Sequence, residues 1–164
     1  MDRVFPLGLP GPTAFYVTLY VLTFALHQAF MQYVLAGSAY VAWATIAPGG
    51  GSTPRWRQLL AGKLRDWMPF MLSAAITAGV APLLFVQVIY GHAFYTAQLL
   101  LAWRWMVVIP VLIAAFYGLY LIKGDATASW RSPARAIVAG AVAAGGVFVG
   151  FCGSANYLLA VDQG

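Results

Sequence analysis

The sequence predicts an all-α integral membrane protein: a four-helix bundle that forms a single transmembrane domain over residues 1–164. Hydrophobic residues make up 62% of the chain and charged residues only 8%, whereas soluble domains carry about 25% charged residues. Four apolar runs are each long enough for the roughly 20-residue helix that crosses a bilayer. Short polar or basic segments separate these runs, so no length remains for a soluble domain.

The first apolar run covers about residues 14–47 and follows the Pro/Gly-rich segment PLGLPGP. It is far longer than the apolar part of a signal peptide, which has about 7–15 residues. We therefore interpret it as a retained span. Because it also exceeds one bilayer thickness, it is expected to tilt or to project beyond the hydrocarbon.

The other three runs cover about residues 67–90, 100–122 and 134–161. Pro82 and Pro110 lie inside the second and third runs, where each removes a backbone donor, so a kink is expected at both. In the fourth run Gly146, Gly150 and Ser154 recur every four residues on one helix face. Small residues allow close helix packing in membranes. Their partner is a helix of this chain or of another subunit.

The basic residues indicate which way the chain crosses the membrane. The net charge is +5, and most of the positive charge lies in the two segments that join the first run to the second and the third to the fourth: Arg55, Arg57, Lys63, Arg65, Lys123, Arg131 and Arg135. Basic loops remain on the cytoplasmic side. Both termini are therefore predicted to be extracytoplasmic. The positive charge is explained by the orientation of the chain in the membrane and does not indicate a nucleic-acid partner. The surrounding partner is the lipid bilayer.

Polar side chains follow one face of the first run. The first stripe, with helical spacing, consists of Tyr20, Thr23, His27, Met31 and Ser38. Gln28 and Gln32 form a second, adjacent stripe. A helix that faces lipid on all sides would not carry both stripes. This helix is therefore expected to turn about half of its surface toward protein or cofactor.

His27 is the main candidate for chemistry in the first run. A buried histidine in a membrane can be a hydrogen-bonded core residue, a proton carrier, or an axial ligand of haem iron through its neutral imidazole. The residue type leaves these three uses open. Small residues nearby, such as Ala36 and Gly37, would leave room for a porphyrin between helices. Met31, on the same stripe, joins His27 as a candidate cofactor-binding residue.

Two further candidates lie in the stretch GVAPLLFVQVIYGHAFY, Gly79 to Tyr95. Gln87 carries an amide that is costly to leave unpaired in hydrocarbon, so it is expected to face the bundle interior. His92 follows Gly91 at the predicted outer end of the span, where it would be solvated or contact a cofactor or substrate. The sequence contains no catalytic triad, phosphate-binding loop, carboxylate pair or metal-ligand cluster.

Two segments resemble the large subunit of cytochrome bd quinol oxidases. The segment LHQAFMQYVLAGSAYV, Leu26–Val41, is similar to the first helix of that subunit, in which a histidine ligates an active-site haem. The segment AGVAPLLFVQVIYG, Ala78–Gly91, is similar to a helix of the form G-V-A-T-G-I-P-x-E-F-Q-F-G and aligns with it from Gly79 to Gly91 without gaps. The order of the segments and the predicted side of the N-terminus also agree.

The resemblance implies that His27 ligates a haem b and that Gln87 occupies the position of an acidic residue beside the haem and the proton path. A glutamine cannot carry a proton, and the family's quinol-binding loop, low-spin haem ligands and later helices have no counterpart in four spans. We therefore expect a reduced, bd-like subunit of the bacterial inner membrane. A complete quinol oxidase is not expected from this chain alone.

Three functions follow from these observations. The first is a membrane subunit of a respiratory or electron-transfer complex that binds haem b and contacts a quinone or a partner such as a multihaem cytochrome near His92. The alternative is a structural or assembly subunit without a cofactor, in which His27 and the glutamines only hydrogen-bond across helices. The third is a small transporter, although the intramembrane carboxylates and lysines that drive ion coupling are missing from the sequence.

Overall fold

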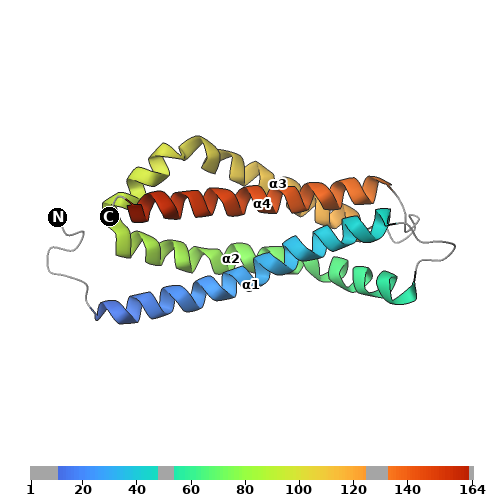
Figure 1. Ribbon diagram of the computed structural model, residues 1–164, viewed down its shortest axis with the longest axis horizontal. Coiled ribbons are helices and arrows are strands. Elements are labelled where there is room, and N and C mark those ends of the chain that lie inside the picture. Colours follow the sequence, from blue (N-terminus) through green and yellow to red (C-terminus); the bar gives the residue numbers. More distant parts are fainter. Residues whose placement is uncertain (1–10, 48–53, 125–132, 163–164) are drawn as a thin grey trace.

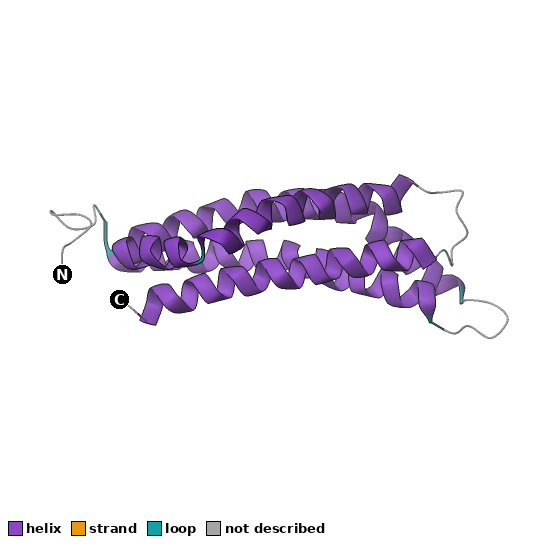
Figure 2. Ribbon diagram, turned by 90° about the horizontal axis from the view of Figure 1, so that it is seen from above, coloured by secondary structure: helices purple, strands orange, loops and turns teal. Residues whose placement is uncertain are grey.

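The computed structural model describes residues 11–47, 54–124 and 133–162 and is almost entirely helical there, with no strand in these ranges (Figures 1 and 2). The helices are α1 (Thr13–Ile46), α2 (Arg55–Leu100), α3 (Ala102–Gly124) and α4 (Pro133–Asp162). Successive helices run in opposite directions along one long axis. Each contains a stretch long and apolar enough to cross a membrane. The predicted all-α chain with four candidate spans is confirmed.

The two ends of the bundle differ in charge. The start of α1 and the end of α4 lie at one end, and the end of α1 lies at the other together with the starts of α2 and α4 (Figure 1). Among the described basic residues, all but Arg104 belong to the segments at this second end, called the basic end below: Arg55, Arg57, Lys63, Arg65, Lys123 and Arg135. Arg3 and Arg131 lie outside the described residues.

The second helix begins at Arg55, well before the predicted start of its span near residue 67. Pro54 precedes its first residue, and the following segment RWRQLLAGKLRD contains no residue that breaks a helix apart from the tolerated Gly62. Hydropathy therefore predicts where the apolar span begins. The helix itself begins earlier, directly after Pro54. The candidate span from Arg55 to Gly91 has 37 residues, about 55 Å of helix, so it extends beyond a hydrocarbon layer of about 30 Å.

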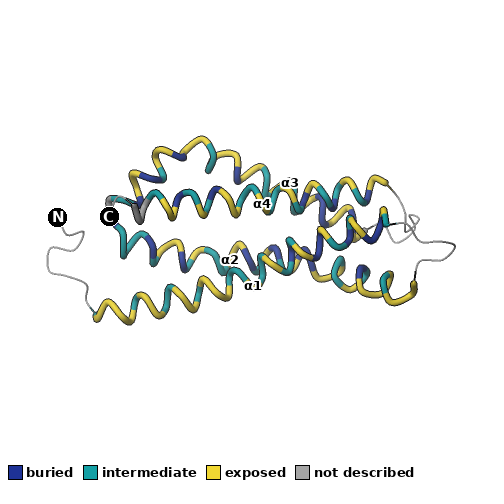
Figure 3. The backbone as a smooth tube through the Cα atoms, in the orientation of Figure 1, coloured by how far each residue is buried: buried dark blue, intermediate teal, exposed yellow. Residues whose placement is uncertain are grey.

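The hydrophobic core lies toward the basic end. It joins buried side chains from all four helices: Val34, Val41, Ala44, Ala61, Met68, Leu72, Leu119, Ile122, Ala139 and Val142. In α1 the buried residues begin at Val34, and the preceding turns are exposed or partly buried (Figure 3). The bundle is thus tightly packed at the basic end and less so toward the start of α1.

The backbone of α2 leaves the helical region at Gly91, where φ is 45° and ψ is −116°. It keeps helical angles at Pro69 and Pro82, so neither proline interrupts the helix, and the kink expected at Pro82 stays a prediction. A proline in a membrane helix is tolerated where neighbouring groups satisfy the freed carbonyl, whereas a positive φ requires glycine. Helix resumes after Gly91 and continues to Leu100, with Phe94 and Ala97 buried. The apolar span therefore ends at Gly91, as expected, but the helical chain continues past it.

Replacing Gly91 tests this break. We expect Gly91→Ala to lower the free energy of unfolding by about 1–3 kcal/mol, because a side chain at this positive φ is strained. Unfolding in detergent micelles measures the change. Gly62→Ala is the matched control: its Cβ would have no atom within 4 Å, so it should be neutral or stabilise α2 slightly. Equal effects of the two substitutions would contradict the assigned strain.

Candidate functional site

His27 joins α1 to α2 through a hydrogen bond to the main chain. Its Nδ1 lies 2.8 Å from the carbonyl oxygen of Ala75. A carbonyl can only accept, so Nδ1 donates and carries the proton. In the neutral ring, Nε2 then has a free lone pair. Of the three uses left open by the sequence, the structure directly provides the hydrogen bond across helices.

The close approach of His27 to α2 depends on Gly79, one turn after Ala75. A Cβ at position 79 would lie 2.9 Å from both Cε1 and Nδ1 of His27, which is shorter than a non-bonded contact allows. Glycine therefore provides the space that the imidazole ring fills. The sequence does not indicate Ala75 or Gly79 as partners of His27, because it does not determine the rotation of α2 against α1.

The second ring nitrogen of His27 is open to a further partner. Within the part of the chain that the structure describes, Nε2 makes no hydrogen bond and is not among the buried polar atoms without a partner. Histidines that ligate metals commonly donate their other ring N–H to a backbone carbonyl, which fixes the tautomer and the ring. The contact with Ala75 has this pattern. The lone pair of Nε2 therefore has no partner among the described residues.

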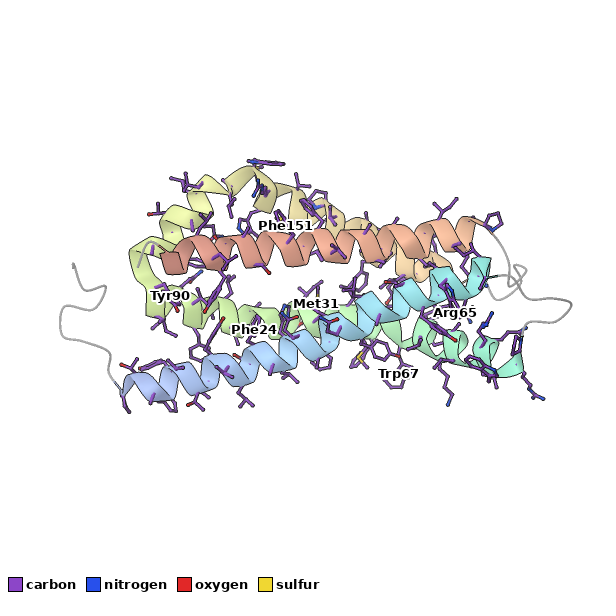
Figure 4. All side chains as sticks on the ribbon, in the orientation of Figure 1. Phe24, Met31, Arg65, Trp67, Tyr90 and Phe151 are labelled. Carbon is purple, nitrogen blue, oxygen red and sulfur yellow. The ribbon has the colours of Figure 1, made fainter. Side chains whose placement is uncertain are left out.

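A cavity of about 250 Å³ lies between the helices near the middle of α1, α3 and α4. Its walls come from all four helices: Gln28, Met31, Gln32, Val34, Leu35, Leu72, Val111, Leu112, Ala115, Val142, Gly145, Gly146, Val147 and Gly150. Figure 4 shows Met31 on the side of α1 that faces α4. Gln32, Val147 and Gly150 are also exposed on the chain surface, so the cavity reaches the region that lipid would occupy.

Gln28 and Gln32 are the only polar side chains in this lining other than the thioether of Met31. They lie one turn apart, and neither amide hydrogen-bonds to another residue that the structure describes. An amide without a partner is costly in a membrane interior. The two groups therefore provide hydrogen-bond donors and acceptors to whatever occupies the cavity. The sequence placed them on a stripe but did not select them as site residues.

The four predicted site residues do not form one site. Met31 lines the cavity, whereas His27 is not part of its lining and contacts α2. Gln87 is partly buried, about 12 Å along α2 from Gly79, and makes no hydrogen bond within the described residues. His92 lies on the helical segment after Gly91, and its side chain is outside what the structure describes.

The small residues of α4 serve two different purposes. A Cβ at Gly145 or Gly146 would meet Val111 of α3 at 3.1 Å or Leu35 of α1 at 3.4 Å, so these two glycines allow packing within the chain. A Cβ at Gly150 would have no atom within 4 Å, and Ser154 is exposed. At Gly146 the predicted packing face contacts α1 of the same chain, whereas at Gly150 and Ser154 it contacts no other described helix closely.

The described residues contain no group of three or more His, Cys, Asp or Glu side chains that could hold a metal ion. A protein-held metal cluster is therefore not a feature of this part of the chain. The candidate site therefore consists of the His27 imidazole beside α2 and a cavity in the middle of the bundle that Gln28 and Gln32 line. A comparison of the chain with models of protein families, with curated protein sequences and with solved structures finds no match.

Proposed function

We propose that this protein is a membrane subunit of a respiratory or electron-transfer complex in the bacterial inner membrane, with both termini extracytoplasmic. The observation that carries the proposal is the hydrogen bond from His27 Nδ1 to Ala75, which leaves Nε2 available as a ligand. The resemblance of Leu26–Val41 and Ala78–Gly91 to cytochrome bd helices supports the same position. The basic end of the bundle then faces the cytoplasm.

The fit of a haem b to these residues is partial. His27 offers one axial nitrogen held in a defined tautomer. The cavity of about 250 Å³ is smaller than the roughly 300–1,000 Å³ of ordinary ligand pockets, and His27 does not line it. If a haem b binds, His27 would hold it outside this cavity, together with a partner subunit. When bound, the haem supplies one-electron transfer, and this chain orients the imidazole.

A quinone fits the same cavity better than a porphyrin does. A cavity of about 150 Å³ already admits benzene, so about 250 Å³ has room for one substituted ring. The amide N–H groups of Gln28 and Gln32 can donate to quinone carbonyls, and the rest of the lining is apolar. Because the cavity lies at the middle of three spans, its occupant would enter from the bilayer. We place the quinone contact here, away from His92.

The second candidate function is a structural or assembly subunit without a cofactor. The same hydrogen bond favours it, because a contact of 2.8 Å between α1 and α2 is sufficient reason for a histidine at position 27. In this function a glutamine at position 27 would do as well, since its amide can donate to the Ala75 carbonyl. The two candidates therefore differ in what the free Nε2 does.

The deciding measurement is a reduced-minus-oxidised optical spectrum of the complex purified from native membranes. We expect haem bands in the wild type and their loss in His27→Gln, which keeps a donor for Ala75 but removes the imidazole ligand. The variant should unfold within about 1 kcal/mol of the wild type, which shows that the fold survives. Haem b bands of unchanged intensity in His27→Gln, or a wild-type complex without haem b, would refute ligation by His27.

A further inference from the structure

Arg57 lies beside two tryptophan rings at the basic end of the bundle. Its guanidinium carbon is 4.7 Å from the ring centroid of Trp43, near the end of α1, and 5.8 Å from that of Trp56 on α2. A guanidinium over an aromatic face still directs its N–H donors outward in its own plane. The rings therefore hold the cation in position and leave its hydrogen-bonding capacity for another group.

No described residue provides the acceptor that Arg57 requires. Its Nε is buried and has no hydrogen-bond partner within the described ranges. Asp66, the one acid described on this part of α2, instead contacts Arg65 at 3.4 Å. A buried charged donor without an acceptor is costly. Because Nε is enclosed by the protein, an acceptor from outside the described chain would contact the terminal Nη groups, which make no hydrogen bond among the described residues, and it is expected to be negatively charged.

The depth of Arg57 identifies the surroundings that such an acceptor comes from. Trp43 and Trp56 are 48% and 60% exposed, and exposed tryptophans near span ends lie at the level of the lipid headgroups. The first turns of α2 also extend beyond the length that the hydrocarbon requires. Exposed Lys63 on the same segment adds positive charge. Phosphate groups of lipids are the anions present at this level.

We propose that Arg57, held against Trp43 and Trp56, binds the phosphate of an anionic phospholipid in the cytoplasmic leaflet. The planar fork of arginine matches two phosphate oxygens, and the two indole rings can pack on the glycerol and upper acyl carbons. This site is independent of the electron-transfer role proposed above. It also differs from general attraction to an anionic surface, because it depends on one arginine in a fixed position.

Lipid binding to the detergent-purified chain tests the proposal. Native mass spectrometry would compare the affinities for phosphatidylglycerol and phosphatidylcholine at low and at high salt. High salt screens exposed charges more than partly buried ones. We expect the wild type to prefer phosphatidylglycerol even at high salt, and Arg57→Gln to reduce that preference by about tenfold. Arg57→Lys should recover only part of it, because lysine keeps the charge but lacks the fork.

Arg55→Gln is the matched control, since it removes the same charge from an exposed position two residues away. It should change the high-salt preference by less than about twofold. Equal losses in Arg55→Gln and Arg57→Gln would overturn the proposal and leave only diffuse surface charge. Equal affinity for both lipids would overturn it too, as would inorganic phosphate that displaces the lipid at similar concentration. The melting temperature in phosphatidylcholine alone checks that each variant is folded.

Discussion

Gly79→Ala is expected to lower the free energy of unfolding by about 1–3 kcal/mol, the usual cost of overpacking a close contact. The added Cβ would lie 2.9 Å from two ring atoms of His27. The ring cannot move aside without losing its 2.8 Å hydrogen bond to Ala75. Denaturant unfolding in detergent micelles measures the loss. This is a large effect for one methyl group, and it tests whether α1 and α2 meet in this register.

The same substitution should have the opposite sign once His27 is removed. In a His27→Ala background the three nearest contacts of this Cβ are removed, and alanine is then expected to gain up to about 0.8–1.0 kcal/mol over glycine through helix propensity. A double-mutant cycle measures this coupling directly. Gly140→Ala is the control, because its Cβ would have no atom within 4 Å and should not destabilise either background. A cost at position 79 that is the same with and without His27 would contradict the contact.

The four candidate spans could be predicted from the sequence because hydropathy averages over about 20 residues and is insensitive to details of packing. The observed bounds of α1 and α4 lie close to those predicted from hydropathy. The start of α2 did not, because the basic segment from Arg55 onward is helical without being apolar. The non-helical backbone at Gly91 was not predicted, because a linear pattern does not show where packing requires a positive φ.

The candidate site was only partly predictable for a similar reason. Periodicity identified the polar face of α1, including His27, but the partner of His27 is a backbone carbonyl, and every residue has one. The cavity depends on small residues such as Ala115 and Gly145, which come together from different helices. Which residues meet is set by the rotation and depth of each helix. Those quantities come from packing and have no local signature in the sequence.

Gly150→Leu is expected to reduce quinone binding to the cavity by about tenfold or more, because the leucine side chain takes up much of a space of about 250 Å³. No atom lies within 4 Å of the Cβ position of Gly150, so the first carbon of the new side chain meets no neighbour. Equilibrium dialysis of 2,3-dimethoxy-5-methyl-1,4-benzoquinone against the chain in lipid nanodiscs measures the affinity, with empty nanodiscs as the blank.

Gly153→Leu is the matched control for this experiment. Gly153 lies one turn further along α4, its Cβ would also have no atom within 4 Å, and it does not line the cavity. Its affinity should equal that of the wild type. Gln28→Leu and Gln32→Leu keep similar volume but remove the donors, so each should weaken binding by about three- to tenfold.

The results of this experiment separate the cavity from the haem proposal. Binding that survives Gly150→Leu and both glutamine substitutions, or that does not exceed the empty-nanodisc blank, would show that the cavity holds lipid or water instead. Dialysis needs no haem, so quinone binding to the chain, combined with a native complex that lacks haem b bands, would support the cavity and reject the role of His27 as a ligand. Haem b bands that depend on His27, without quinone binding, would support His27 as a ligand and reject the cavity as a quinone site. Because His27 contacts α2 and does not line the cavity, the structure allows each outcome without the other.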